Sequence, residues 1–165
     1  MAASATSILR GGRIRQTGQV TADVTVSNVF DEARAEDGDL APSAVRSVEL
    51  RQVMVDTGAN MLCLPSDAIA RLGLRKLREV TALAAAGERT TNIYRGASLT
   101  VNGRTGTFEV LETPGGAMPL FGVHPLEALG IELDLQNQQL VMLPERGDGT
   151  YISVLELVRR NESSG

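Results

Sequence analysis

Apolar and polar residues alternate in several short stretches of the chain, and alternation with a period of two is the pattern of half-buried strands. Within residues 20–29, Ala22, Val24 and Val26 form an apolar face, so we expect this stretch to pair in a sheet. Further strands are expected at 45–55, 60–64, 80–85, 89–94, 98–101, 107–111, 120–122, 133–135 and 139–143. The pattern therefore predicts a mostly β protein.

Two short helices are expected to interrupt the strands. Ser66 can cap a helix that runs to residue 72, and Gly73 supplies the stop. A second helix is expected over 125–129, with proline in its first turn and glycine after its end. Residues 31–43 are rich in acidic residues, glycine and proline without periodicity, so we expect an exposed loop that joins two strands as a long hairpin.

The chain has 165 residues and a mass of 17.5 kDa, the size of one globular domain. The strand and helix signals fall within residues 20–144, which we assign to that domain. Residues 1–19 are expected to form a flexible N-terminal tail. Residues 145–165 are expected to form a C-terminal tail, for which a helical stretch over 152–160 is an open alternative.

The first residues carry Arg10, Arg13 and Arg15 among serines and threonines, which mildly resembles an organellar transit peptide. They lack the apolar stretch of a secretory signal, so a solvated tail is the favoured interpretation. A single cysteine suits a reducing compartment. We therefore expect a cytoplasmic protein and leave organellar targeting open.

Composition narrows the possible chemistry. A formal charge of −4 and a pI near 5.1 argue against a nucleic-acid partner, which would call for a basic face. No apolar run approaches the roughly 18 residues of a membrane span, so no membrane partner is expected. One cysteine and one histidine exclude a disulfide framework and a Cys/His zinc site. Carboxylate chemistry is left as the main catalytic option.

The sharpest chemical signal is Asp56-Thr57-Gly58-Ala59, which directly follows the apolar run Val53-Met54-Val55. A buried strand would deliver Asp56 into a tight turn, where Gly58 lets the backbone approach the carboxylate closely. The Thr57 hydroxyl can hydrogen-bond within such a loop. On these residues alone, an ordinary turn capped by Asp56 is an equally good interpretation.

Three blocks of the sequence resemble the retropepsin-like aspartic peptidases, the single-domain relatives of the retroviral proteases. Residues 53–60 resemble the catalytic loop of that family, and residues 82–91, centred on Gly87, lie where the family has its flap hairpin. Residues 120–134 resemble the apolar-apolar-glycine strand, short helix and Leu-Gly exit that close its barrel. The likeness covers roughly residues 20–144.

The resemblance implies a mostly β, single-domain acid-protease half-barrel with two short helices that forms a C2 homodimer. The active site would contain Asp56 from each chain, one ionised to activate a water and one protonated to donate to the scissile carbonyl. Thr57 would brace the paired loops, and the Gly58 N–H would stabilise the carboxylate. No metal or cofactor is implied.

By the same resemblance, a peptide or protein substrate would bind in extended form as an added strand beneath the flap. The residues expected to bind it are Ala59, Asn60, Leu83, Ala84, Ala85, Ala86, Gly87, Phe121 and Val123. Hydrolysis of a peptide bond is the activity that this arrangement implies.

The sequence also departs from the family. Many retroviral members pair an acid with an arginine at the positions held here by Asn60 and Val123, and the flap has one glycine where theirs have several. A non-catalytic dimeric domain that binds peptides or acts as a scaffold is therefore the alternative to a peptidase. A nucleophilic pair of Cys63 and His124 is a minor alternative, because nothing in the sequence supplies a third, orienting group.

Overall fold

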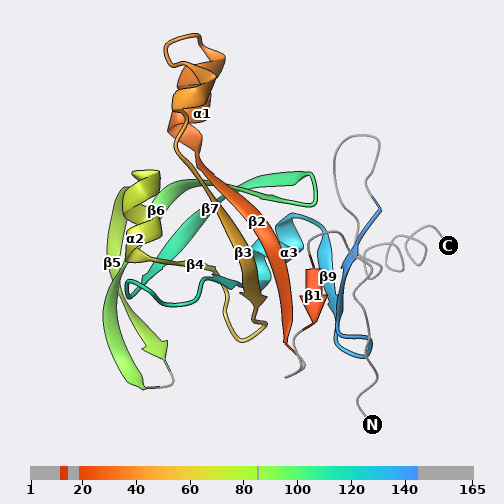
Figure 1. Cartoon of the computed structure of the whole chain (residues 1–165). Helices are drawn as coiled ribbons and strands as arrows, with labels where there is room; N and C mark the ends of the chain where they lie inside the picture. The colour runs from red at the N-terminus through yellow and green to blue at the C-terminus, as the bar shows by residue number, and fades with distance from the viewer. Residues whose placement is uncertain (1–11, 15–18, 85, 145–165) are drawn as a thin grey trace, which may run out of the picture.

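The computed structural model describes residues 12–14, 19–84 and 86–144. Strands dominate this part of the chain, and Figure 1 shows them wrapped into one body from which α1 projects. The elements in chain order are β1 (Gly12–Ile14), β2 (Val20–Asn28), α1 (Val29–Glu36), η1 (Pro42–Ala44), β3 (Ser47–Val55), β4 (Leu62–Pro65), α2 (Ser66–Leu72), β5 (Arg75–Ala84), β6 (Gly87–Val101), β7 (Arg104–Thr113), β8 (Leu120–Phe121), α3 (Val123–Ala128), β9 (Ile131–Asp134) and β10 (Gln139–Met142).

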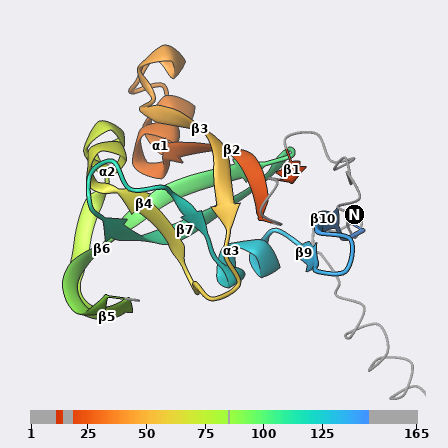
Figure 2. The same cartoon turned by 60° about the horizontal axis from the view of Figure 1, so that its bottom comes forward.

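The main sheet closes on itself. Its strand order is β1-β2-β3-β8-β4-β7-β6-β5, and an additional pairing of β2 with β6 joins six of these strands into a barrel. β5 extends from β6 as the hairpin that leaves the barrel, while β9 and β10 form a separate two-stranded sheet (Figure 2). The prediction of a mostly β protein with few helices is confirmed.

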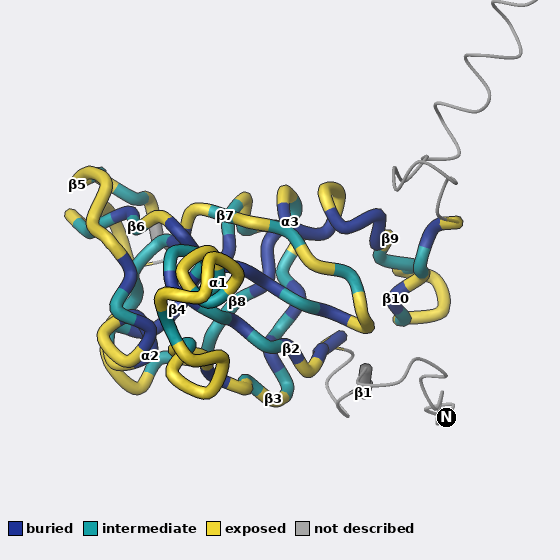
Figure 3. The backbone as a smooth tube through the Cα atoms, turned by 90° about the horizontal axis from the view of Figure 1, so that it is seen from above, coloured by how far each residue is buried: buried dark blue, intermediate teal, exposed yellow. Residues whose placement is uncertain are grey.

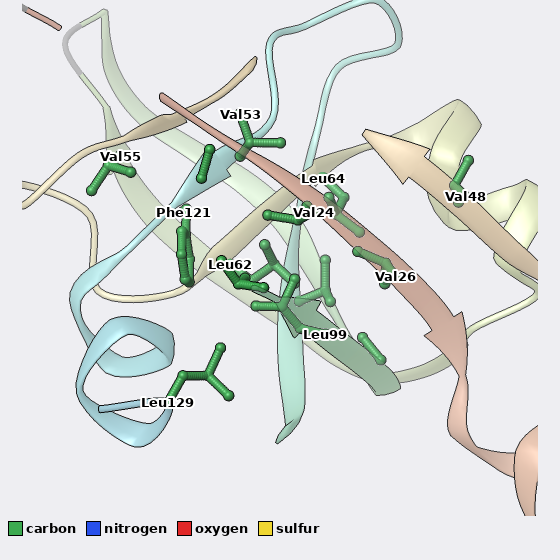
Figure 4. Close-up of a cluster of buried hydrophobic side chains, with 14 of the residues drawn as sticks. Val24, Val26, Val48, Val53, Val55, Leu62, Leu64, Leu99, Phe121 and Leu129 are labelled. Atoms are coloured by element: carbon green, nitrogen blue, oxygen red, sulfur yellow. The ribbon is translucent and has the colours of Figure 1, made fainter. Parts of the chain in front are cut away.

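Aliphatic side chains and one aromatic ring fill the barrel (Figure 4). Val24 and Val26 of β2 meet Leu62 and Leu64 of β4 and Phe121 of β8, and each is at most 4% exposed. Burying one such side chain contributes roughly 1.5–3 kcal/mol to stability. Figure 3 shows buried positions along the barrel strands and exposed positions in the turns and on α1. The apolar residues predicted to form one face of β2 therefore point into the core, and the residues between them are mostly more exposed.

The exposed loop predicted over residues 31–43 is wrong, because this segment contains helix α1 and the short helix η1. The Asn28 side chain accepts hydrogen bonds from the N–H groups of Phe30, at 2.9 Å, and Asp31, at 3.1 Å, and so caps α1. Asp31 is 4% exposed and accepts two hydrogen bonds from the Arg46 guanidinium, at 2.7 and 2.9 Å. The buried residue of α1 is thus an acid whose partner lies fifteen residues away. A search for periodic apolar residues therefore does not detect this helix.

The two predicted helices are present. α2 spans the predicted residues and ends at Gly73, whose φ of 60° is the left-handed conformation that glycine adopts readily. Ser66 is its first helical residue and makes no side-chain cap. α3 begins at Val123, two residues before the predicted start. No helix in the described part of the chain is long and apolar enough to cross a membrane.

Several predictions concern residues outside the described ranges. These are the N-terminal residues 1–11, the helical stretch over 152–160 within the C-terminal tail, and Ala85 of the predicted flap. Residues 12–14, inside the predicted N-terminal tail, form β1 and pair with the start of β2. The domain limits at residues 20 and 144 stay predictions.

Candidate active site

Asp56 lies where the barrel strand β3 ends, and strand β8 sets its place. β8 runs between β3 and β4, parallel to β3 with Val55 opposite Phe121, and antiparallel to β4 with Leu62 opposite Phe121. The Asp56 N–H donates to the carbonyl of Phe121 at 3.2 Å. Because β8 separates β3 from β4, the chain between them has to arch over its end, and this arch is the loop that carries Asp56.

The loop folds back on its own aspartate. The Gly58 N–H donates to Asp56 Oδ1 at 2.9 Å, and the Ala59 N–H donates to the Asp56 carbonyl at 3.1 Å. A Cβ placed on Gly58 would lie 3.1 Å from Asp56 Oδ1, tighter than an ordinary contact. The loop therefore fixes one carboxylate oxygen with a backbone donor.

A second glycine ties this loop to α3. The N–H of Val123 donates to the Ala59 carbonyl at 2.9 Å, and that of His124 donates to the Asn60 carbonyl at 3.1 Å. A Cβ on Gly122 would lie 2.4 Å from the Met61 carbonyl oxygen, closer than side chains are found. The first and third sequence blocks are thus held together by backbone bonds that only a residue without a side chain permits at this position.

The Asp56 side chain is open to a cavity of about 340 Å³. Asp56 is half-buried and Thr57 and Gly58 are exposed, so the carboxylate can meet a solvent molecule or a partner. The cavity is lined by Gln19, Val20, Met54, Val55, Asp56, Thr57, Leu133, Leu135 and Gln138. Three of these residues belong to β9 and the turn after it, and the sequence pattern did not assign them to the site. No sequence motif marks them, and the 73% exposure of Leu135 is known only from the structure.

The Asp-Thr-Gly turn, its own N–H-to-carboxylate bond and the strand inserted between β3 and β4 form one constellation. A sequence profile described as "Aspartyl protease" matches residues 41–125, just over half of the chain, and contains all of it. The chain belongs to the aspartyl protease family. This confirms the resemblance to the retropepsin-like aspartic peptidases. No curated protein sequence matches this chain.

The predicted flap lies at the tip of the β5–β6 hairpin. Leu83 is 84% exposed, Ala86 and Gly87 are exposed, and the φ of 110° at Gly87 requires glycine. Ala84 ends β5. None of the residues described at this tip lines the Asp56 cavity, so a substrate-binding role for them stays a prediction.

The other predicted site residues lie around the Asp56 loop, but they differ in how far their side chains are exposed. Phe121 is fully buried in the core, so it acts on the site through the carbonyl that binds the Asp56 N–H, while its ring does not face the cleft. Asn60 is exposed and Val123 is half-buried. Neither residue can form the ion pair of many retroviral members, and at these positions the structure has backbone hydrogen bonds from Val123 to Ala59 and from His124 to Asn60.

Cys63 is a core residue. It is 4% exposed, and its thiol lies 3.7 Å from the Met61 carbonyl. Burial, with a contribution from the nearby Asp56 charge, raises the pKa of the Cys63 thiol to about 11. The thiol is therefore protonated at neutral pH, which argues against the minor alternative of a nucleophilic pair with the exposed His124. The described residues contain no group of three or more His, Cys, Asp or Glu side chains that could hold a metal ion.

Proposed function

We propose that this protein is a homodimeric aspartic endopeptidase that hydrolyses peptide bonds through a water held between two Asp56 carboxylates. The observation that carries the proposal is a half-buried Asp56 in a loop held by Gly58 and Gly122, open to a cavity. The reaction needs one carboxylate as base and one as acid. The chain contains a single Asp-Thr-Gly sequence, so the second carboxylate has to come from a second copy.

In the reaction, the ionised Asp56 removes a proton from the water as its oxygen bonds to the scissile carbonyl carbon. The protonated Asp56 gives its proton to the carbonyl oxygen, which produces a tetrahedral diol. When the diol collapses, the C–N bond breaks and the amine leaves with a proton returned from the aspartate pair. The Gly58 N–H orients one oxygen of each carboxylate, so both acids enter the reaction in a fixed rotamer.

The surface beside Asp56 favours a second copy at this place. Leu135 is 73% exposed at the end of β9, and Leu133 and Leu135 form one wall of the Asp56 cavity. Exposed apolar side chains that gather at one edge mark a protein interface. A twofold axis through this region would cover them and bring two Asp56 side chains together.

The substrate in this proposal is an extended peptide that lies between the Asp56 loop and the β5–β6 hairpin. An added strand obtains its affinity from backbone hydrogen bonds and its selectivity from alternating side chains. The exposed Leu83 near the hairpin tip supplies an apolar surface that could close over it. The cytoplasm stays our proposal for the location.

A non-catalytic dimeric domain that binds peptides or acts as a scaffold is the second candidate. Two features favour it: the positions of the family's ion pair hold Asn60 and Val123, and the flap turn contains only Gly87. Losing both halves of an ion pair leaves no unpaired charge, so it weakens a dimer without removing the catalytic acid. The intact Asp56 loop favours the peptidase, since a binding domain needs no acid there.

Cleavage of a diverse peptide library by the full chain separates the two candidates. We expect products from the wild type that are most abundant at mildly acidic pH, where one acid of the pair keeps its proton, and none from the Asp56→Asn variant. Wild-type protein that binds peptides and leaves them intact would establish the binding domain. Cleavage that survives Asp56→Asn would overturn the assignment.

A further inference from the structure

The end of the β5–β6 hairpin farthest from the flap carries a concentration of positive charge. Arg75 on β5, Arg95 on β6 and Arg71 in the last turn of α2 are all exposed. The whole chain has a formal charge of −4, so this grouping is opposite in sign to the protein. We call these three residues, together with the ring of Phe30, the arginine face.

Two of these cations are placed against each other. Arg75 and Arg95 are direct partners in the register of β5 and β6, and like charges at opposing positions destabilise a strand pair. Neither forms a salt bridge within the described part of the chain. Both guanidinium groups instead lie over the Phe30 ring, with centroid distances of 4.2 Å for Arg75 and 6.0 Å for Arg95.

The fold holds the Phe30 ring in this place. Phe30 lies in the first turn of α1, where its N–H donates to the capping Asn28 side chain at 2.9 Å. On the strand beside it, Gly96 has a φ of 93°, and a Cβ there would lie 2.5 Å from the ring. The bidentate pair of Asp31 and Arg46 fixes the same helix from its other side. Phe30 is therefore a rigid platform for the two arginines.

A guanidinium that lies on a ring face keeps its N–H edge free, and that edge matches the two oxygens of a carboxylate. We propose that the arginine face docks an acidic segment, rich in Asp and Glu, of a protein substrate. The word substrate rests on the peptidase function proposed above, whereas the docking itself does not. The contact replaces the unfavourable pair of facing cations with two charge-assisted pairs.

A short peptide fits this surface better than a long polyanion. Glu36, Asp37 and Asp39 are exposed at the end of α1 and would repel a polyanion that extends beyond the arginine face. The same two strands lead to the flap, and the eight steps from Gly87 to Arg95 along β6 span about 26 Å at roughly 3.3 Å per residue. The acidic segment should therefore lie about eight or more residues away from the bond that is cut.

Direct binding to the full-length Asp56→Asn protein tests the docking without any need for activity. The probes are a fluorescent eight-residue peptide of Asp and Glu and its counterpart of Asn and Gln, followed by fluorescence anisotropy. We expect the acidic peptide to bind at least tenfold more tightly, and added salt to weaken its binding. Equal affinity for the two peptides would overturn the inference, as would tighter binding of a single-stranded oligonucleotide of the same length.

Variants locate the binding. Arg75→Gln with Arg95→Gln should raise the Kd of the acidic peptide at least tenfold, whereas Arg51→Gln, an exposed arginine on β3 outside the arginine face, should leave it within twofold. An unchanged Kd in the double variant would refute the proposal. If the double variant does not fold, Arg75→Gln and Arg95→Gln should each alone raise the Kd severalfold, and no rise in either would refute it equally.

The docking and the peptidase function can fail separately. An acidic peptide that binds while no peptide is ever cut leaves the docking in place and removes the peptidase. If peptides are cut, adding an acidic segment to one should lower its KM for the wild type and not for the double variant, with kcat unchanged. Cleavage with no such difference in KM would overturn the docking and leave the peptidase.

Discussion

Two aspartates lie at opposite ends of the β2–β3 strand pair, and they are held in opposite ways. Asp31 follows β2, is 4% exposed, and accepts both hydrogen bonds of the Arg46 guanidinium. Asp56 follows β3, is half-buried, and accepts a single hydrogen bond, from its neighbour Gly58, among those described for its side chain. Both oxygens of the Asp31 carboxylate are bonded within the chain, whereas one oxygen of the Asp56 carboxylate is available to a water or a substrate.

The difference lies in what builds each region. The junction around Asp31 is made by side chains, since Asn28 binds the carbonyl of Leu72 at 2.9 Å and Arg46 binds Asp31. The loop around Asp56 is made by backbone bonds, which its glycines allow to form at close range. Because backbone bonds hold this loop, one oxygen of the Asp56 carboxylate is not used to stabilise it. A catalytic acid needs such an available oxygen.

The largest expected effect is the loss of peptidase activity in Asp56→Asn, with Asp31→Asn as the matched control. Asp56→Asn removes both the base and the acid from the dimer and should lower kcat/KM by at least about 10³-fold, because each such group typically contributes about 10²–10⁴. Asp31→Asn should leave kcat/KM within about threefold at a temperature where the variant is folded. Peptide cleavage assays on both purified variants make the comparison. If Asp56→Asn also stays within about threefold of the wild type, Asp56 has no catalytic role.

Gly122→Ala tests whether the Asp56 loop depends on backbone contact. The new Cβ would lie 2.4 Å from a carbonyl oxygen, which cannot rotate away, so we expect the free energy of unfolding to fall by about 3 kcal/mol. Gly58→Ala is the matched change, because its Cβ would meet the flexible Asp56 carboxylate at 3.1 Å. It should lower activity and cost less than about 1 kcal/mol in urea denaturation. Equal destabilisation by the two would contradict this division.

The sequence predicted the Asp56 region far better than the Asp31 region, for a physical reason. The Asp56 loop and α2 depend on local signals, such as an apolar run that ends in Asp-Thr-Gly and a glycine after Leu72. α1 depends on Asn28, which lies within a strand pattern, and on a partner fifteen residues away. No hydrophobic period marks a helix whose one buried residue is an acid.

The same reasoning explains what was missed at the site and in the hairpin. Leu133 and Leu135 become part of the Asp56 cavity only when the β9–β10 hairpin folds against the ends of the barrel strands. β5 begins at Arg75, five residues before the predicted start. The prediction missed these first residues because they are mostly charged and show no alternation of apolar and polar side chains. Their pairing with β6 includes a bulge between Lys76 and Arg78, which breaks the period of two.

The ion pair of Asp31 should make the free energy of unfolding depend on pH in the acidic range. The pKa of Asp31 is lowered from 3.8 to about 2, chiefly by the hydrogen bond from Arg46, although burial opposes this. A carboxyl whose pKa is depressed in the folded state contributes stability above its unfolded value, and that contribution is lost as pH falls from about 4 toward 2. Asp31→Asn should therefore lower the free energy of unfolding by about 2 kcal/mol at pH 6. Urea denaturation should show the difference from wild type shrinking between pH 4 and pH 2.5, and a constant difference would contradict the ion pair.

The smallest expected effect tests the claim that the Asp56 site, unlike the ion pair of Asp31, needs a second chain. Wild-type protein is mixed with a ninefold excess of Asp56→Asn, and subunit exchange is confirmed with a labelled chain. About one wild-type chain in ten then meets another, so cleavage per wild-type chain should fall about tenfold by mass action. An equal excess of Arg51→Gln, which keeps its Asp56, should not lower it. Cleavage that is unchanged by exchanged Asp56→Asn would place the whole active site within one chain and exclude the shared pair of carboxylates.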